Sequence, residues 1–135
     1  MNASIEHLNP KGLHRNPAYS QGVVVGGPVR TVYVGGQNAV DSEGNLVGPG
    51  DLKAQSVRAL RNVEAVVSAA GGRLDDVVKW NVFIVEGQPI PPGFEAFREV
   101  WPVDAEPPVV TVAIVAGLGN PDYLVEIEAI AVIAS

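Results

Sequence analysis

One stretch decides the fold: Leu124-Val125-Glu126-Ile127-Glu128-Ala129-Ile130-Ala131-Val132-Ile133, an apolar run that two carboxylates interrupt. Its length and its isoleucine and valine content predict a β-strand. Alternate residues of a strand share a face, so Glu126 and Glu128 lie on the same side as Ile130. Both faces carry large apolar side chains. The stretch is therefore expected to be an inner strand that is covered on both faces.

An ionised carboxylate on such a strand needs a specific environment. It can pair with a cation or lie at an exposed rim, which would make Glu126 and Glu128 structural residues. It can also border a cleft in which it accepts and donates protons. The strand pattern alone leaves both interpretations open for each glutamate.

Composition limits the class of protein. The 135 residues, 47% of them hydrophobic, predict a single domain over residues 1–135 with a substantial core. Nine lysines and arginines against fifteen aspartates and glutamates give a net charge of −6, and the cations are scattered along the chain. A nucleic-acid partner is therefore not expected.

The chain has no cysteine, which excludes disulfides, thiolate nucleophiles and cysteine-ligated metals. His7 and His14 stand in a polar segment without the acidic cluster of a metal site, so neither a metal nor a cofactor is expected. The N-terminus lacks the pattern of a secretory signal, and no apolar run is long enough to span a membrane. A cytoplasmic protein without a membrane partner is the expectation.

The remaining pattern predicts an α+β fold in the order β-β-α-β-α-β-β. Turn residues and apolar periodicity indicate a first hairpin around Gly26-Gly27-Pro28 and an amphipathic helix that Asp51 caps and Gly71-Gly72 ends. Two helices are expected to cover one face of one sheet, and the valine-rich strands leave the other face to self-association. The predicted elements span residues 22–25, 30–35, 51–70, 77–85, 94–101, 109–115 and 124–133.

Four more residues are candidates for binding a ligand. Gly35 and Gly36 end a predicted strand, where bare backbone can approach a ligand or simply form a tight turn. Phe94 belongs to an aromatic group that lines a pocket or fills the core. Arg98, beside it, is either a carboxylate anchor or a solvated or subunit-bridging arginine.

Several segments, in their order and spacing, resemble the Rid family, also called YjgF. That resemblance implies a chorismate-mutase-like fold with a mixed sheet, and a homotrimer whose sheets form a central barrel with three clefts between subunits. The matching segments are Asn16-Pro17-Ala18-Tyr19-Ser20-Gln21-Gly22, Val34-Gly35-Gly36-Gln37, Ala69-Ala70-Gly71-Gly72, Leu74-Asp75-Asp76-Val77-Val78-Lys79 and Val125-Glu126-Ile127-Glu128-Ala129-Ile130-Ala131.

The resemblance also implies a function. Members of the best-known branch hydrolyse reactive enamines and imines, such as 2-aminoacrylate, to keto acids and ammonia without a cofactor. Tyr19 matches the cleft tyrosine of the family, and Glu126 matches the glutamate thought to position or activate water. The expected activity is therefore that of a cofactor-free hydrolase or deaminase of a small-molecule imine or enamine, with Glu126 and Tyr19 as catalytic residues.

One departure from the family places the chain in a branch unlike the best-known one. The family arginine that grips the substrate carboxylate corresponds here to Val109. Either Arg98 supplies the cation from another wall of the cleft, or Val109 makes the cleft apolar for an uncharged or larger imine. Efficient turnover of 2-aminoacrylate is not expected. A homotrimer that binds and protects or senses a metabolite is the alternative, and an endoribonuclease ranks below both because of the acidic balance.

Overall fold

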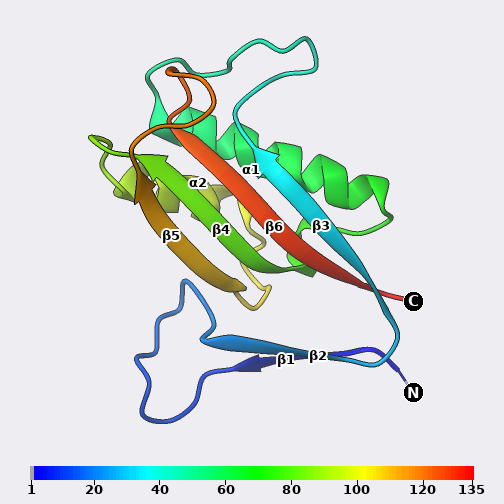
Figure 1. Ribbon diagram of the computed structural model, residues 1–135. Coiled ribbons are helices and arrows are strands. Elements are labelled where there is room, and N and C mark those ends of the chain that lie inside the picture. Colours follow the sequence, from blue (N-terminus) through cyan, green and yellow to red (C-terminus); the bar gives the residue numbers. More distant parts are fainter. Residues whose placement is uncertain (1) are drawn as a thin grey trace.

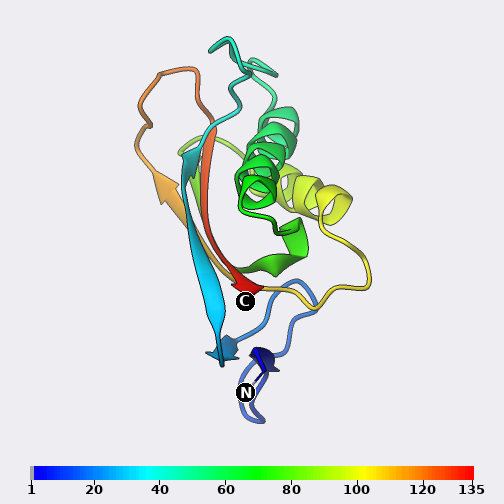
Figure 2. The same ribbon diagram turned by 90° about the vertical axis from the view of Figure 1, so that its right-hand side faces the viewer.

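The computed structural model describes residues 2–135. Two helices lie on one face of a four-stranded sheet, and a two-stranded ribbon extends below it (Figures 1 and 2). The elements are β1 (Ser4–Leu8), β2 (Gly22–Gly26), β3 (Val29–Gln37), α1 (Leu52–Ala69), a short 3-10 helix (Leu74–Asp76), β4 (Val77–Val85), α2 (Pro91–Val100), β5 (Val109–Val115) and β6 (Val125–Ala134).

The sheet has the strand order β3-β6-β4-β5. Strand β6 pairs antiparallel with both β3 and β4, whereas β4 and β5 are parallel and α2 connects them. The sheet is therefore mixed, and the predicted α+β fold is confirmed. The run 124–133 is an inner strand, as its pattern indicated.

Only one face of β6 is fully covered. Its odd-numbered residues, such as Ile127 and Ala131, are buried beneath the helices, while Glu126, Glu128 and Ile130 on the other side are half-buried. Figure 2 shows both helices on the same side of the sheet. The sheet face away from the helices, called the open face below, is uncovered in a single chain. The expectation that both faces of this strand are covered is therefore confirmed only for the helix side.

Local sequence signals predicted both ends of α1 to within one residue. The Asp51 side chain accepts a hydrogen bond from the Ala54 backbone N–H at 3.0 Å and caps the first turn. Gly71, with φ +89°, ends the helix in a conformation that favours glycine. The buried residues of α1 face β6 and β3 and form the core together with buried residues of β6, β4 and α2.

The predicted hairpin between residues 22–25 and 30–35 is wrong. Strand β2 pairs antiparallel with β1, and β3 pairs with β6. Strand β1 was missed because its five residues, three of them polar, show no clear apolar alternation, while its pairing uses backbone groups that every sequence has. Gly27, with φ +78°, packs so closely on the backbone of residues 2 and 3 that a side chain there would clash, and the ribbon turns away from the sheet.

Much apolar surface stays uncovered, as the sequence indicated. Tyr33 on the open face is 77% exposed, and Val24, Val25 and Ile114 are also exposed. Within residues 2–135 no helix is long and apolar enough to cross a membrane.

Candidate functional site

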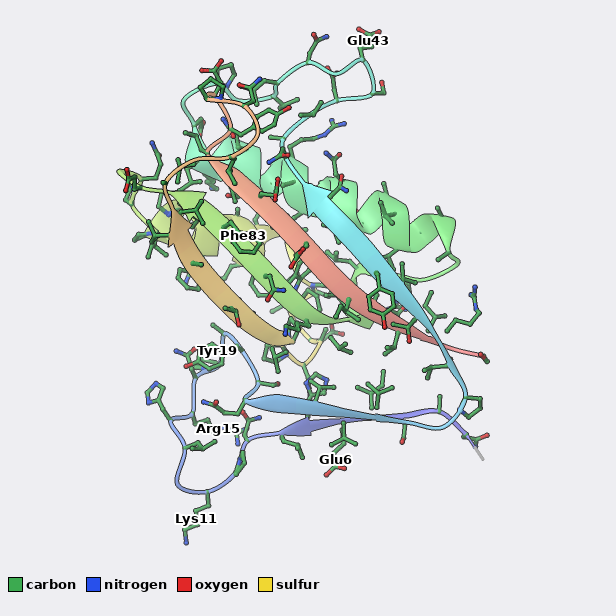
Figure 3. All side chains as sticks on the ribbon, viewed as in Figure 1. Glu6, Lys11, Arg15, Tyr19, Glu43 and Phe83 are labelled. Carbon is green, nitrogen blue, oxygen red and sulfur yellow. The ribbon has the colours of Figure 1, made fainter. Side chains whose placement is uncertain are left out.

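Glu126 lies on the open face, where its strand neighbour in β4 is Phe83. Figure 3 labels Phe83 on that strand. Its half-buried side chain packs against the backbone at the end of β3. A Cβ on Gly36 would lie 2.8 Å from both the carboxyl carbon and Oε2 of Glu126, so this approach requires glycine. None of the four ion pairs formed within residues 2–135 includes Glu126. The carboxylate is thus held by packing and is free of a neutralising cation in the described chain.

Glu128, two residues further along the same face, has a different environment. Its Oε1 accepts a hydrogen bond of 2.9 Å from Asn81 Nδ2 on β4. Glu128 and Asn81 border a depression of about 310 Å³, which Tyr33 and Lys79 also line. Sequence reasoning passed over Lys79 and Asn81, although alternation along β4 against the buried Trp80 could have placed them on this face.

Val109 and Lys79 are direct neighbours. They are paired residues of the parallel strands β5 and β4, and so they share the open face. Neighbouring strands lie about 4.8 Å apart, which brings a lysine next to the position where the family arginine was expected. Lys79 lies four residues before Phe83, the partner of Glu126, so Lys79 and Glu126 are about 13 Å apart along the strands.

Tyr19 and Phe94 lie elsewhere. Both line a cavity of about 140 Å³ between α2 and the helix-covered face of the sheet, together with residues such as Ile84 and Phe97. Figure 3 shows Tyr19 in the segment between β1 and β2, beneath β5. Within one chain, Tyr19 and Phe94 are thus on the opposite face of the sheet from Glu126.

The segment that carries Tyr19 is held by buried Ser20. The Ser20 N–H donates to the Pro108 carbonyl at 3.0 Å, and its hydroxyl donates to the Pro107 carbonyl at 2.6 Å. His7 Nδ1 lies 2.9 Å from the same hydroxyl. These contacts fix Tyr19 beside the beginning of β5.

The other candidates are spread over the fold. Arg98 is exposed on α2, on the helix side, so a single chain does not bring it to Glu126. Gly35 is exposed, with open space where a Cβ would lie. Most of the aromatic group is core, because Trp80 is 1% exposed and contacts Phe97 and Trp101 edge-on. No group of three or more potential metal ligands occurs among residues 2–135.

Comparison with known proteins gives consistent matches over most of the chain. A family model described as Endoribonuclease L-PSP matches residues 12–133. A RutC family protein of Saccharolobus solfataricus is 37% identical over 115 residues, which cover 84% of this chain and 85% of that protein. A RutC family protein of Pyrococcus abyssi is 33% identical over 113 residues, 84% of each chain.

Solved structures show the same architecture. YyfB of Yersinia pestis, described as a member of the conserved Rid protein family, superposes with a TM-score of 0.83 at 30% identity, covering 96% of this chain and 98% of that one. TdcF of E. coli, solved with bound serine, gives a TM-score of 0.68 at 32% identity, covering 76% of this chain and 80% of that one. The chain therefore belongs to the Rid (YjgF) family, whose family model is described as Endoribonuclease L-PSP.

Proposed function

We propose that this protein hydrolyses a reactive imine or enamine to a carbonyl compound and ammonia, without a cofactor, in clefts between the subunits of a cytoplasmic homotrimer. The observation that carries the proposal is Glu126, a half-buried carboxylate on an otherwise apolar strand that has no ion-pair partner within residues 2–135. Family membership supports a small-molecule ligand, and the serine bound to TdcF is an example from one relative.

Glu126 can move the protons that the reaction needs. As water adds to the carbon of the C=N bond, the carboxylate accepts a proton from that water. It returns the proton to the nitrogen, which yields a carbinolamine. Glu126 then takes the hydroxyl proton of the carbinolamine and delivers it to the nitrogen, so that ammonia leaves as the C–N bond breaks and the carbonyl group forms. An enamine enters the same sequence after its tautomerisation to the imine.

The proposed homotrimer brings together side chains that a single chain keeps on opposite faces of its sheet. Tyr19 and Arg98 are on the helix side of their own sheet, so they reach the open face beside Glu126 only from a neighbouring subunit. Tyr33, exposed on the edge strand β3, and the half-buried Phe83 and Ile130 leave apolar surface on the open face, which supports such an association.

Substrate choice depends on the cation that replaces the family arginine. Lys79 stands next to Val109 on the same face and provides a positive charge at that place. Arg98 of a neighbouring subunit is the second candidate. An ammonium lacks the bidentate geometry of a guanidinium, so slow turnover of 2-aminoacrylate is expected even where Lys79 binds the carboxylate.

The test is hydrolysis of freshly generated imines, with and without an α-carboxylate. Glu126→Gln should lower kcat by roughly 100-fold or more, since the side chain no longer accepts a proton. Glu6→Gln, which changes an exposed strand glutamate outside the site, is the matched control. Lys79→Met and Arg98→Met are compared on the two classes of imine, and the one that supplies the anchor should raise KM for the carboxylated imine alone.

Three results would overturn parts of the proposal. Equal rates for Glu126→Gln and Glu6→Gln would remove Glu126 from the chemistry. Saturable binding of an imine without any turnover by the wild type would favour a trimer that binds and protects a metabolite. Turnover of RNA would favour the activity in the family description, which the net charge of −6 argues against here.

A further inference from the structure

We infer that the cavity between α2 and the sheet is a second ligand site, for a compact, neutral and mainly apolar molecule that carries one carbonyl oxygen. This helix-side cavity has a volume of about 140 Å³ and is lined by Ala18, Tyr19, Ser56, Leu60, Trp80, Val82, Ile84, Ile90, Gly93, Phe94, Phe97, Val110, Val112 and Ile127. Glu126 points to the opposite face of the sheet. The cavity shares Tyr19 and Phe94 with the candidate residues of the proposed cleft, but the inference rests on Ser56 and Trp80, which the proposed function does not use.

Two polar atoms in the wall of the helix-side cavity are unpartnered. Ser56 Oγ on α1 and Trp80 Nε1 on β4 are buried and have no hydrogen-bond partner within residues 2–135. Their side chains are deeply buried, at 2% and 1% exposure. Buried polar atoms of native proteins almost always have a partner. Two exceptions in the lining of one cavity indicate that a bound molecule supplies the missing acceptor.

The donors define the chemistry of that molecule. An indole N–H donates and cannot accept, and a serine hydroxyl can donate as well. One carbonyl oxygen has two lone pairs and can accept from both. None of the lining residues carries a formal charge, and most are aliphatic or aromatic. A charged ligand would lose its hydration there without compensation, so the molecule is neutral.

The size and the rim of the helix-side cavity fit a small ring. An apolar cavity of roughly 150 Å³ holds a benzene-sized molecule. Phe94 and Ile90, at the rim, are 41% and 37% exposed, so the cavity can be reached from solvent. On the inner side, Ser56 Oγ faces Gly93 of α2, where a Cβ would lie 4.0 Å from it. The absence of a side chain at Gly93 keeps this part of the cavity open.

The experiment uses acetophenone as the probe and ethylbenzene, its hydrocarbon counterpart, as the control. The indole N–H resonances of ¹⁵N-labelled protein are followed during titration. Trp101 Nε1 donates to the Ala105 carbonyl and does not line the cavity, so its signal is an internal reference. Acetophenone should shift the Trp80 signal in a saturable way and bind roughly 10- to 100-fold more tightly than ethylbenzene, the value of two hydrogen bonds.

Two variants distinguish the contribution of the Ser56 hydrogen bond to binding from that of the cavity volume. Ser56→Ala should weaken acetophenone roughly 3- to 10-fold and leave ethylbenzene unchanged. Gly93→Leu, whose side chain occupies the cavity, should abolish the binding of both. Ser68→Ala, an exposed serine on the same helix, should change neither.

The inference is overturned if the Trp80 signal shows no saturable shift, or if Gly93→Leu binds acetophenone as the wild type does. Equal affinity for acetophenone and ethylbenzene would also overturn it, because water rather than a ligand would then satisfy the two donors. Since Ser56→Ala removes only one oxygen atom, it remains informative if Gly93→Leu does not fold.

Discussion

The buried amide of Gln55 is predicted to be the polar contact whose loss costs the most stability. Its side chain is 0% exposed within α1. Nε2 donates to the carbonyls of Gly48 and Asp122, each at 3.2 Å, and Oε1 accepts from the Leu124 N–H at 2.9 Å. Gln55 thereby ties α1 to the loop before it and to the chain just ahead of β6, two residues from Glu126.

Gln55→Met keeps the length and approximate volume of the side chain but removes all three hydrogen bonds. Each net hydrogen bond contributes about 1 kcal/mol, so the free energy of unfolding should fall by about 3 kcal/mol. That is a large share of the 5–15 kcal/mol that is typical of a domain. For a chain of this length it corresponds to a melting temperature lower by roughly 10 °C.

The measurement is urea unfolding followed by tryptophan fluorescence, at one fixed protein concentration because association would add to the apparent stability. Gln37→Met is the matched control, since that glutamine makes one exposed hydrogen bond, to the Gly35 carbonyl. The control should lose less than about 0.5 kcal/mol. If Gln55→Met were no less stable than the control, the buried network would not contribute as its geometry indicates.

Two glycine substitutions test close approaches of the backbone. Gly36→Ala should reduce imine hydrolysis strongly while the protein stays folded, because the new Cβ would displace the Glu126 carboxylate, whereas Gly35→Ala has open space for its Cβ, leaves the carboxylate in place and should lose far less activity. Gly72→Ala should lower the free energy of unfolding by roughly 1–3 kcal/mol, because its Cβ would lie 2.7 Å from Ile133 Cδ1. Urea unfolding checks the second prediction, with Gly35→Ala again as the control, and no difference between the two variants would contradict it.

The parts of the fold that depend on local signals could be predicted from the sequence. The Asp51 cap and the glycines after α1 fixed that helix to within a residue at each end, and the strand 77–85 has the predicted bounds. The pairing of β2 could not be predicted in this way. A partner strand is chosen by long-range backbone contacts, and a polar strand such as β1 carries no apolar alternation that reveals it.

For the candidate site, the sequence indicated which residues are chemically unusual, but not which residues lie next to one another in the fold. The strand pattern singled out Glu126 as an unusual carboxylate in an apolar strand, and within residues 2–135 it has no ion-pair partner, while its catalytic role stays a prediction. The importance of Lys79 depends on the parallel pairing of β4 with β5, which no local pattern shows. The unpartnered Ser56 and Trp80 looked like ordinary core residues, because satisfaction of a buried polar atom is a property of the packed structure.

The separation of Tyr19 from Glu126 limits which mechanisms are available to this protein. A β-sheet is a barrier between its two faces, and the two side chains lie on opposite sides of it. Because Ser20 anchors the Tyr19 segment to Pro107 and Pro108, Tyr19 cannot reach the open face of its own chain while those hydrogen bonds persist. A reaction that uses both groups therefore requires two chains, whereas a reaction that a single chain performs must use Glu126 without Tyr19.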